Sequence, residues 1–100
     1  MMLRDIAHSR AGDKGNLSTI SVIAYKLDDY ALIRDAVTEE VVKSHFKPIG
    51  VTKVERFELP QLGALNFVLH DTLDGGVTRS LAIDTHGKTL GTFMLELEIK

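Results

Sequence analysis

Residues 17–25, LSTISVIAY, decide the fold. Ile20, Val22 and Ala24 fall on one face of this segment, Thr19 and Ser21 fall on the other, and β-branched residues are frequent. Alternation with a period of two is typical of a half-buried β-strand. A second, weaker strand pattern lies at residues 3–9, LRDIAHS. The two segments therefore predict a pair of strands joined by residues 10–16, RAGDKGN.

The joining segment is rich in glycine and charge; its members are Arg10, Ala11, Gly12, Asp13, Lys14, Gly15 and Asn16. Its two glycines permit positive φ, so that successive N–H groups can turn towards one point and hold an anion. Arg10 and Lys14 would add charge-assisted contacts to a phosphate or carboxylate, and Asp13 would orient them. The alternative is an ordinary long hairpin loop, because Gly, Asp and Asn are common turn residues. Neither a Walker A loop nor a dinucleotide-binding fingerprint fits the spacing.

Further along the chain, residues 28–46 predict one kinked helix or two short ones, with a second helical start at Thr38 and acidic residues in its first turn. Residues 51–59 predict a strand. Residues 61–73 predict a helix, with Leu62, Leu65, Leu69 and Leu73 along one stripe. This helix would be apolar around most of its circumference, so we expect it at a protein–protein interface.

Gly75 and Gly76 would end that helix, or form a second backbone concavity beside Arg79. Residues 78–84 and 88–100 predict two final strands joined by a turn at Gly87. The element order is then ββαβαββ. It predicts an α+β, ferredoxin-like sandwich with an antiparallel-rich sheet and two helices on one face.

Composition narrows the classes of function. The chain has 100 residues, which predicts one domain over residues 1–100, and it contains no cysteine, which excludes disulfides and thiolate metal sites. Its four histidines lack the spacing of metal ligands, and no pattern indicates a cofactor. With a net charge of −2 and no basic stripe, nucleic-acid binding has little support. No signal peptide or membrane-spanning run is visible, so we expect a cytoplasmic protein without a membrane partner.

Four segments carry a resemblance to a known family: residues 7–24, AHSRAGDKGNLSTISVIA; residues 59–69, LPQLGALNFVL; residues 73–81, LDGGVTRSL; and residues 84–91, DTHGKTLG. Together they resemble the small C-terminal domain of the acyclic terpene utilisation (AtuA-like) proteins. The resemblance implies a ferredoxin-like domain, here in its separate short form, linked to the catabolism of acyclic terpenes and branched acyl-CoA thioesters. This chain departs from the family at Ala11, where we expect Ser, and at Ala82, where an Arg is frequent.

The resemblance implies that the family's string occupies Arg10, Gly12, Asp13, Lys14, Gly15 and Asn16. The later segments are matched by Asn66, Gly75, Gly76, Arg79, Ser80, Asp84, Gly87 and Lys88. We therefore predict an anion- or substrate-binding site formed by Arg10, Gly12, Asp13, Lys14, Gly15, Asn16 and Arg79.

Three functions remain open at this point. The first is an accessory subunit that binds a larger AtuA-like protein, or itself, through the helix from Leu62 to Leu73 or through a sheet edge. In this case its glycine-rich loop would hold the anionic part of an acyl-CoA or a similar ligand. The second is an independent enzyme in which Asp13 or His8 acts as acid or base and Lys14 stabilises charge. The third is a structural dimerisation module without a ligand.

Overall fold

The computed structural model describes residues 1–14, 17–70 and 90–99. The strands are β1 (Ala7–Lys14), β2 (Leu17–Ala24), β3 (Lys53–Leu59) and β4 (Ala64–His70). The α-helices are α1 (Tyr30–Ala36), α2 (Glu39–His45) and α4 (Leu90–Leu95). Short 3-10 turns occupy η1 (Leu3–Asp5), η2 (Leu27–Asp29), η3 (Lys47–Ile49) and η4 (Pro60–Leu62).

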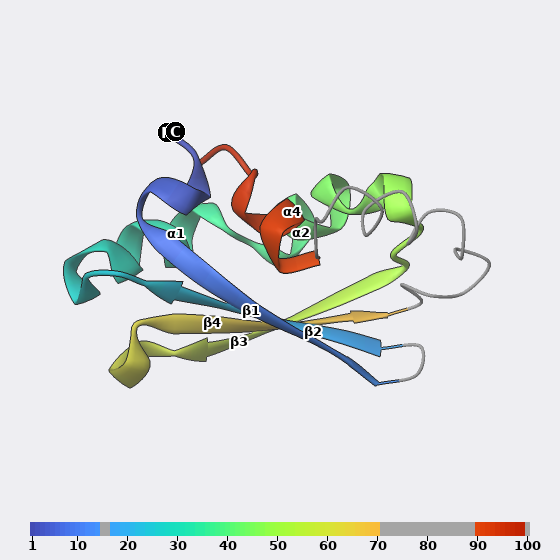
Figure 1. Ribbon diagram of the computed structural model, residues 1–100, viewed down its shortest axis with the longest axis horizontal. Helices are drawn as coiled ribbons and strands as arrows, with labels where there is room; N and C mark the ends of the chain where they lie inside the picture. The colour runs from blue at the N-terminus through green and yellow to red at the C-terminus, as the bar shows by residue number, and fades with distance from the viewer. Residues whose placement is uncertain (15–16, 71–89, 100) are drawn as a thin grey trace.

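Within the described residues, the strands form one sheet in the order β1-β2-β4-β3, and every neighbouring pair is antiparallel. The helices α1, α2 and α4 lie on the same face of this sheet (Figure 1). The buried core between the two layers includes Ile20, Val22, Phe46, Phe67 and Met94. The α+β class and the ferredoxin-like arrangement predicted from the sequence are therefore confirmed.

The strand order is that of a βαββαβ unit whose last strand has moved to the front of the chain. Followed from β2, the chain runs strand, helices, β3, β4, α4, and β1 then completes the sheet beside β2. The two ends of the chain lie together (Figure 1). The Ile99 N–H donates to the Met1 carbonyl at 2.9 Å, and the Leu3 N–H donates to the Leu97 carbonyl at 2.8 Å. This junction ties α4 to β1.

The predicted helix at residues 61–73 is wrong over residues 61–70, where the structure forms the turn η4 and the strand β4, and residues 71–73 lie outside the described residues. Leu65, Phe67 and Leu69 are fully buried, whereas the intervening Asn66 and Val68 are only half-buried. A leucine every four residues fits a strand as well as a helix, since four is also a multiple of the strand period of two. The turn ends at Gly63, which has a φ of 62°. The interface helix from Leu62 to Leu73 therefore does not exist as predicted.

The predicted strand at residues 88–100 is also wrong over Leu90–Leu95, which form α4. Gly91, Met94 and Leu97 are buried at a spacing of three residues, although the apolar side chains also alternate. Gly91 has a packing role, since a Cβ at this position would lie 2.7 Å from Ser9 Oγ of β1. The predicted strand at residues 78–84, the turn at Gly87 and the concavity at Gly75 and Gly76 lie outside the described residues.

Of the remaining predicted elements, the strand at residues 17–25, the helices within residues 28–46 and the strand at residues 51–59 are confirmed, whereas the strand predicted at residues 3–9 begins only at Ala7, after the turn η1. Thr38 begins α2 as expected, because its hydroxyl accepts a hydrogen bond from the Val41 N–H at 3.2 Å. The carbonyls at the end of α1 are satisfied from the sheet. Arg56 Nη1 of β3 donates to the carbonyls of Arg34 at 2.5 Å and Val37 at 3.0 Å. One guanidinium therefore fastens α1 to the edge strand.

Candidate functional site

The glycine-rich string is mostly strand rather than loop. Arg10 lies opposite Ser21, Gly12 opposite Thr19, and the pairing of β1 with β2 continues to Lys14. The predicted loop geometry is therefore wrong for residues 10–14. Extended backbone points successive N–H groups to opposite sides, so these residues do not gather their N–H groups around one anion.

The structure places the predicted site residues as follows. Arg10 and Gly12 are exposed on β1. Asp13 and Lys14 end β1 and pair with Ser18 and Leu17. Gly15, Asn16 and Arg79 lie outside the described residues. Among the predicted site residues, Arg10 and Gly12 are therefore the two whose surroundings the structure describes.

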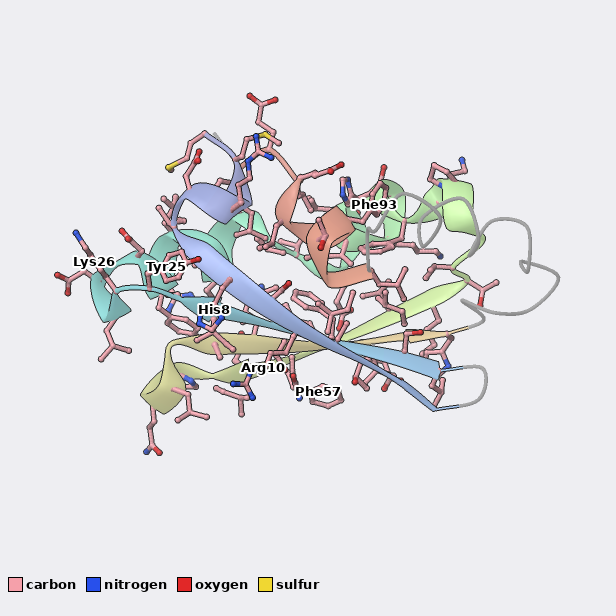
Figure 2. The ribbon with its side chains drawn as sticks, in the orientation of Figure 1. His8, Arg10, Tyr25, Lys26, Phe57 and Phe93 are labelled. Carbon is pink, nitrogen blue, oxygen red and sulfur yellow. The ribbon has the colours of Figure 1, made fainter. Side chains whose placement is uncertain are left out.

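The sheet surface opposite the helices is left open, and we call it the open face. Side chains alternate along each strand, so the neighbours of the buried core residues point to this side. Figure 2 shows Arg10 and Phe57 on it, away from the helices. Its polar and charged members are His8, Arg10, Thr19, Ser21, Asn66, His70, Lys53 and Glu55, and its apolar members are Leu17, Ile23, Val68, Phe57 and Leu59.

One row of the open face crosses all four strands. Arg10 lies opposite Ser21, Ser21 opposite Asn66, and Asn66 opposite Phe57. Ser21 Oγ donates to Asn66 Oδ1 at 2.5 Å. This bond uses the amide oxygen as its acceptor, and the same amide carries two N–H donors on Nδ2. Arg10 is exposed and has no ion pair with the described residues.

Charge is confined to the rim of the open face. Among the described residues, the central strands β2 and β4 carry no Asp, Glu, Lys or Arg there, whereas the edge strands carry Arg10, Lys53 and Glu55. Phe57 keeps half of its surface exposed, at 50%. An uncharged centre with an exposed aromatic and a charged rim is the composition of a protein–protein interface.

A second polar contact lies at the β3 side of the open face. His70 Nε2 and Glu55 Oε2 are 2.6 Å apart. The hydrogen bond from His70 lowers the pKa of the Glu55 carboxyl below its ordinary value of 4.5, against a smaller opposing effect of desolvation. Glu55 is therefore a carboxylate at neutral pH, and its partner fixes its position.

His8 lies at the other end of the open face. Its ring stacks on that of Tyr25, with the centroids 5.2 Å apart (Figure 2). Tyr25 itself is largely exposed, at 64%. The contact places His8 against an aromatic surface two residues before Arg10.

A shallow hollow beside α2 differs from the open face in that it is acidic. It is lined by Thr38, Glu39, Glu40, Arg56 and Glu58. Its one cation, Arg56, already donates to two helix carbonyls and pairs with Glu58 at 3.2 Å. The arrangement stabilises the helix end and leaves an acidic surface that repels anions.

No group of three or more His, Cys, Asp or Glu side chains in residues 1–14, 17–70 and 90–99 has the geometry to hold a metal ion. In the same part of the chain, no helix has the length and hydropathy needed to cross a membrane.

Comparison with known families identifies the chain through one match. The model of the AtuA ferredoxin-like domain matches residues 1–100, the whole chain. The protein belongs to the AtuA ferredoxin-like domain family. Searches among curated proteins and among solved structures found no match.

The AtuA ferredoxin-like fold brings together two segments that carry the family resemblance. Arg10 comes from the RAGDKGN string and Asn66 from LPQLGALNFVL, and the register of three strands sets them in one row with Ser21. Sequence reasoning missed Ser21, Glu55 and Phe57 as surface residues of interest. Only the cross-strand register identifies them, because Ser21 lies on β2 and Glu55 and Phe57 lie on β3, and the sequence does not align these two segments with each other.

Proposed function

We propose that this AtuA ferredoxin-like domain is an accessory partner of a larger AtuA-type protein in the catabolism of acyclic terpenes and branched acyl-CoA thioesters. Membership in the family supports a role beside such a protein. The domain binds through its open face and supplies part of a shared site for the anionic end of the substrate.

The observation that carries this proposal is the charge pattern of the open face. The solvated face of an antiparallel sheet is normally polar along every strand. Within the described residues, the two central strands present Thr19, Ser21, Ile23, Asn66 and Val68 here, and the Arg, Lys and Glu side chains lie on the edge strands. Such a surface loses little hydration free energy when a partner covers it, because no ion at its centre has to be desolvated.

The donors of the open face support an anionic ligand at its β1 side. Arg10 provides a guanidinium, which binds carboxylate or phosphate through two parallel hydrogen bonds. Asn66 provides amide N–H donors whose direction is fixed by the bond from Ser21. In the proposed complex the partner covers Phe57 and the centre of the face, and the anion lies between Arg10 and the partner surface.

The rest of the predicted site comes from the family string that contains Arg10 and from a later family segment. Gly12, Asp13 and Lys14 follow Arg10 along β1, and Gly15 and Asn16 complete the string. Arg79 is the further cation proposed for the anion. The binding role of all these residues rests on the family resemblance, with the row through Arg10 as its physical support.

Co-purification with a larger AtuA-type protein tests the docking role. We expect the wild-type chain to form a complex and Phe57→Asp to abolish it, because the substitution puts a charge at the apolar part of the face. Val41→Asp is the matched control, since Val41 is an exposed apolar residue, at 37%, on α2 of the opposite layer. Equal binding of both variants would refute docking through the open face.

Calorimetric titration of the complex with coenzyme A and with an acyl-CoA tests the anion role. Arg10→Ala should weaken binding by about tenfold or more, as expected for the loss of a charge-assisted contact. Lys53→Ala is the control, because it removes one positive charge from the opposite edge of the same face. A similar weakening by both variants would indicate general attraction and refute a specific site at Arg10.

A further inference from the structure

Independently of the proposed function, the two edges of the sheet differ in whether another group protects their backbone hydrogen-bonding groups. At the β3 edge, the Arg56 N–H points out of the sheet and donates to Glu39 Oε2 at 2.8 Å. That carboxylate from α2 occupies the position where another strand would bind. Native sheets commonly protect an edge in this way, since an unpaired edge is a template for another strand.

The register shows which groups β1 presents at the opposite edge. Arg56 lies opposite Phe67, Phe67 opposite Ile20, and Ile20 opposite Ala11. Residues along an antiparallel ladder alternate between bonding to one neighbour and to the other. Because Arg56 points outward, Phe67 bonds to β2, Ile20 bonds to β4, and Ala11 points outward on the far side.

The same alternation makes Ser9 and Asp13 outward-bonding residues of β1. No described residue outside β2 forms a backbone hydrogen bond with Ala7–Lys14. The side chains of Ser9 and Ala11 lie beside Gly91 on the helix side and leave the edge clear. Ala11 and Gly12 are exposed. Within the described residues, β1 therefore presents an unprotected edge, in contrast with β3.

We propose that two copies of this chain pair through β1, antiparallel about a two-fold axis at Ala11, to form a continuous eight-stranded sheet. In this register Ser9 lies opposite Asp13 of the second copy, Ala11 opposite Ala11, and Arg10 opposite Gly12. Each outward N–H and C=O group of one β1 strand can then form a hydrogen bond with an outward group of β1 in the second copy. Moving the axis by one residue to Arg10 would place two guanidinium groups directly opposite, which destabilises a strand pair.

Charge at Gly12 tests this register. Gly12 tolerates a side chain, because a Cβ there would lie 3.4 Å from Thr19 Oγ1, an ordinary contact. In the dimer, the glutamate of Gly12→Glu would lie opposite Arg10 of the other copy at two symmetric positions, so this variant should dimerise more tightly. Gly12→Lys would place two positive charges opposite each other at the same positions, so it should dimerise more weakly. Each change should be about 2- to 30-fold in the dissociation constant. The double variant Arg10→Glu/Gly12→Lys recreates an opposite-charge pair with reversed signs, so it should dimerise about as tightly as Gly12→Glu.

Sedimentation velocity of the isolated chain across micromolar concentrations provides the readout. We expect a dimer that Ala11→Pro converts to monomer, since proline removes the outward N–H while the pairing with β2 is kept. Circular dichroism verifies that this variant folds, and the Gly12 variants test the register without it. A monomer at the highest concentration, or a dimer indifferent to all four variants, would overturn the proposal. A dimer lost in Phe57→Asp but retained in Ala11→Pro would place self-association on the open face and would also overturn it.

Discussion

Ser21 of β2 and Asn66 of β4 are directly opposite each other and joined by a 2.5 Å hydrogen bond between Oγ and Oδ1. Their strands form the centre of the sheet, and both side chains are half-buried. The bond fixes the orientation of the Asn66 amide, and this orientation determines whether the centre of the open face offers donors or acceptors.

A double-mutant cycle on this pair tests its strength. Ser21→Ala and Asn66→Ala should each lower the free energy of unfolding by about 0.5–1.5 kcal/mol. The double variant should lose less than the sum of the two, because both single variants remove the same bond. Urea denaturation measures all four proteins. Strictly additive losses would show that the pair makes no net contribution.

The Glu55–His70 contact predicts a pH dependence. The folded pKa of Glu55 lies below its ordinary value of 4.5, so folding favours the carboxylate. The contact should therefore stabilise the protein above that pH, and this stabilisation should disappear as the pH falls through the folded pKa. His70→Asn should raise the pKa of Glu55 towards its ordinary value. Carbon-detected NMR titration of the Glu55 carboxyl measures the shift, and an unchanged pKa would contradict the assignment.

Packing of α4 on β1 predicts a coupling between Gly91 and Ser9. A Cβ at residue 91 would lie 2.7 Å from Ser9 Oγ, so Gly91→Ala forces that hydroxyl to move. Alone, the substitution should gain little from the higher helix propensity of alanine. In a Ser9→Ala background the same substitution should stabilise by up to about 1 kcal/mol, since the obstructing oxygen is absent. Thermal or chemical denaturation of the four proteins gives the coupling, and its absence would indicate looser packing.

Two phenylalanines on opposite faces of the sheet should respond differently to truncation. Phe67 of β4 is fully buried, so Phe67→Ala should cost about 3–5 kcal/mol through lost packing and a residual cavity. Phe57→Ala should cost about 0.5 kcal/mol or less, because half of the side chain is exposed in the free domain. Similar losses for both would contradict the assignment of the two faces.

Local sequence patterns correctly predict the first strand pair, the helices between residues 30 and 45, the strand β3 and the α+β class. These elements have local signals, such as the alternation through Ile20 and Val22 and the cap at Thr38. The two wrong elements have patterns that fit both periods. Leucines at 65 and 69 share a face in a helix and in a strand, and only pairing with Phe57 and Ser21 on the neighbouring strands selects the strand for β4.

The candidate site shows the same division between local and non-local information. Arg10 was identified from its own string, and Asn66 from the family resemblance. Their place in a common row depends on register across three strands, which no local pattern specifies. The sequence predicts a loop over residues 10–16, because its glycines permit turns, but pairing with β2 keeps the backbone extended from Arg10 to Lys14.

The proposed function depends on binding of the larger AtuA-type protein to the open face. The most direct test adds that protein, unlabelled, to the isotope-labelled domain and follows the NMR spectrum of the domain. We predict loss or displacement of the signals of Phe57, Asn66 and Val68 and of the Arg10 side chain, with Val41 and Lys43 on α2 unaffected. Perturbation confined to α2, or an unchanged spectrum at saturating partner, would contradict it.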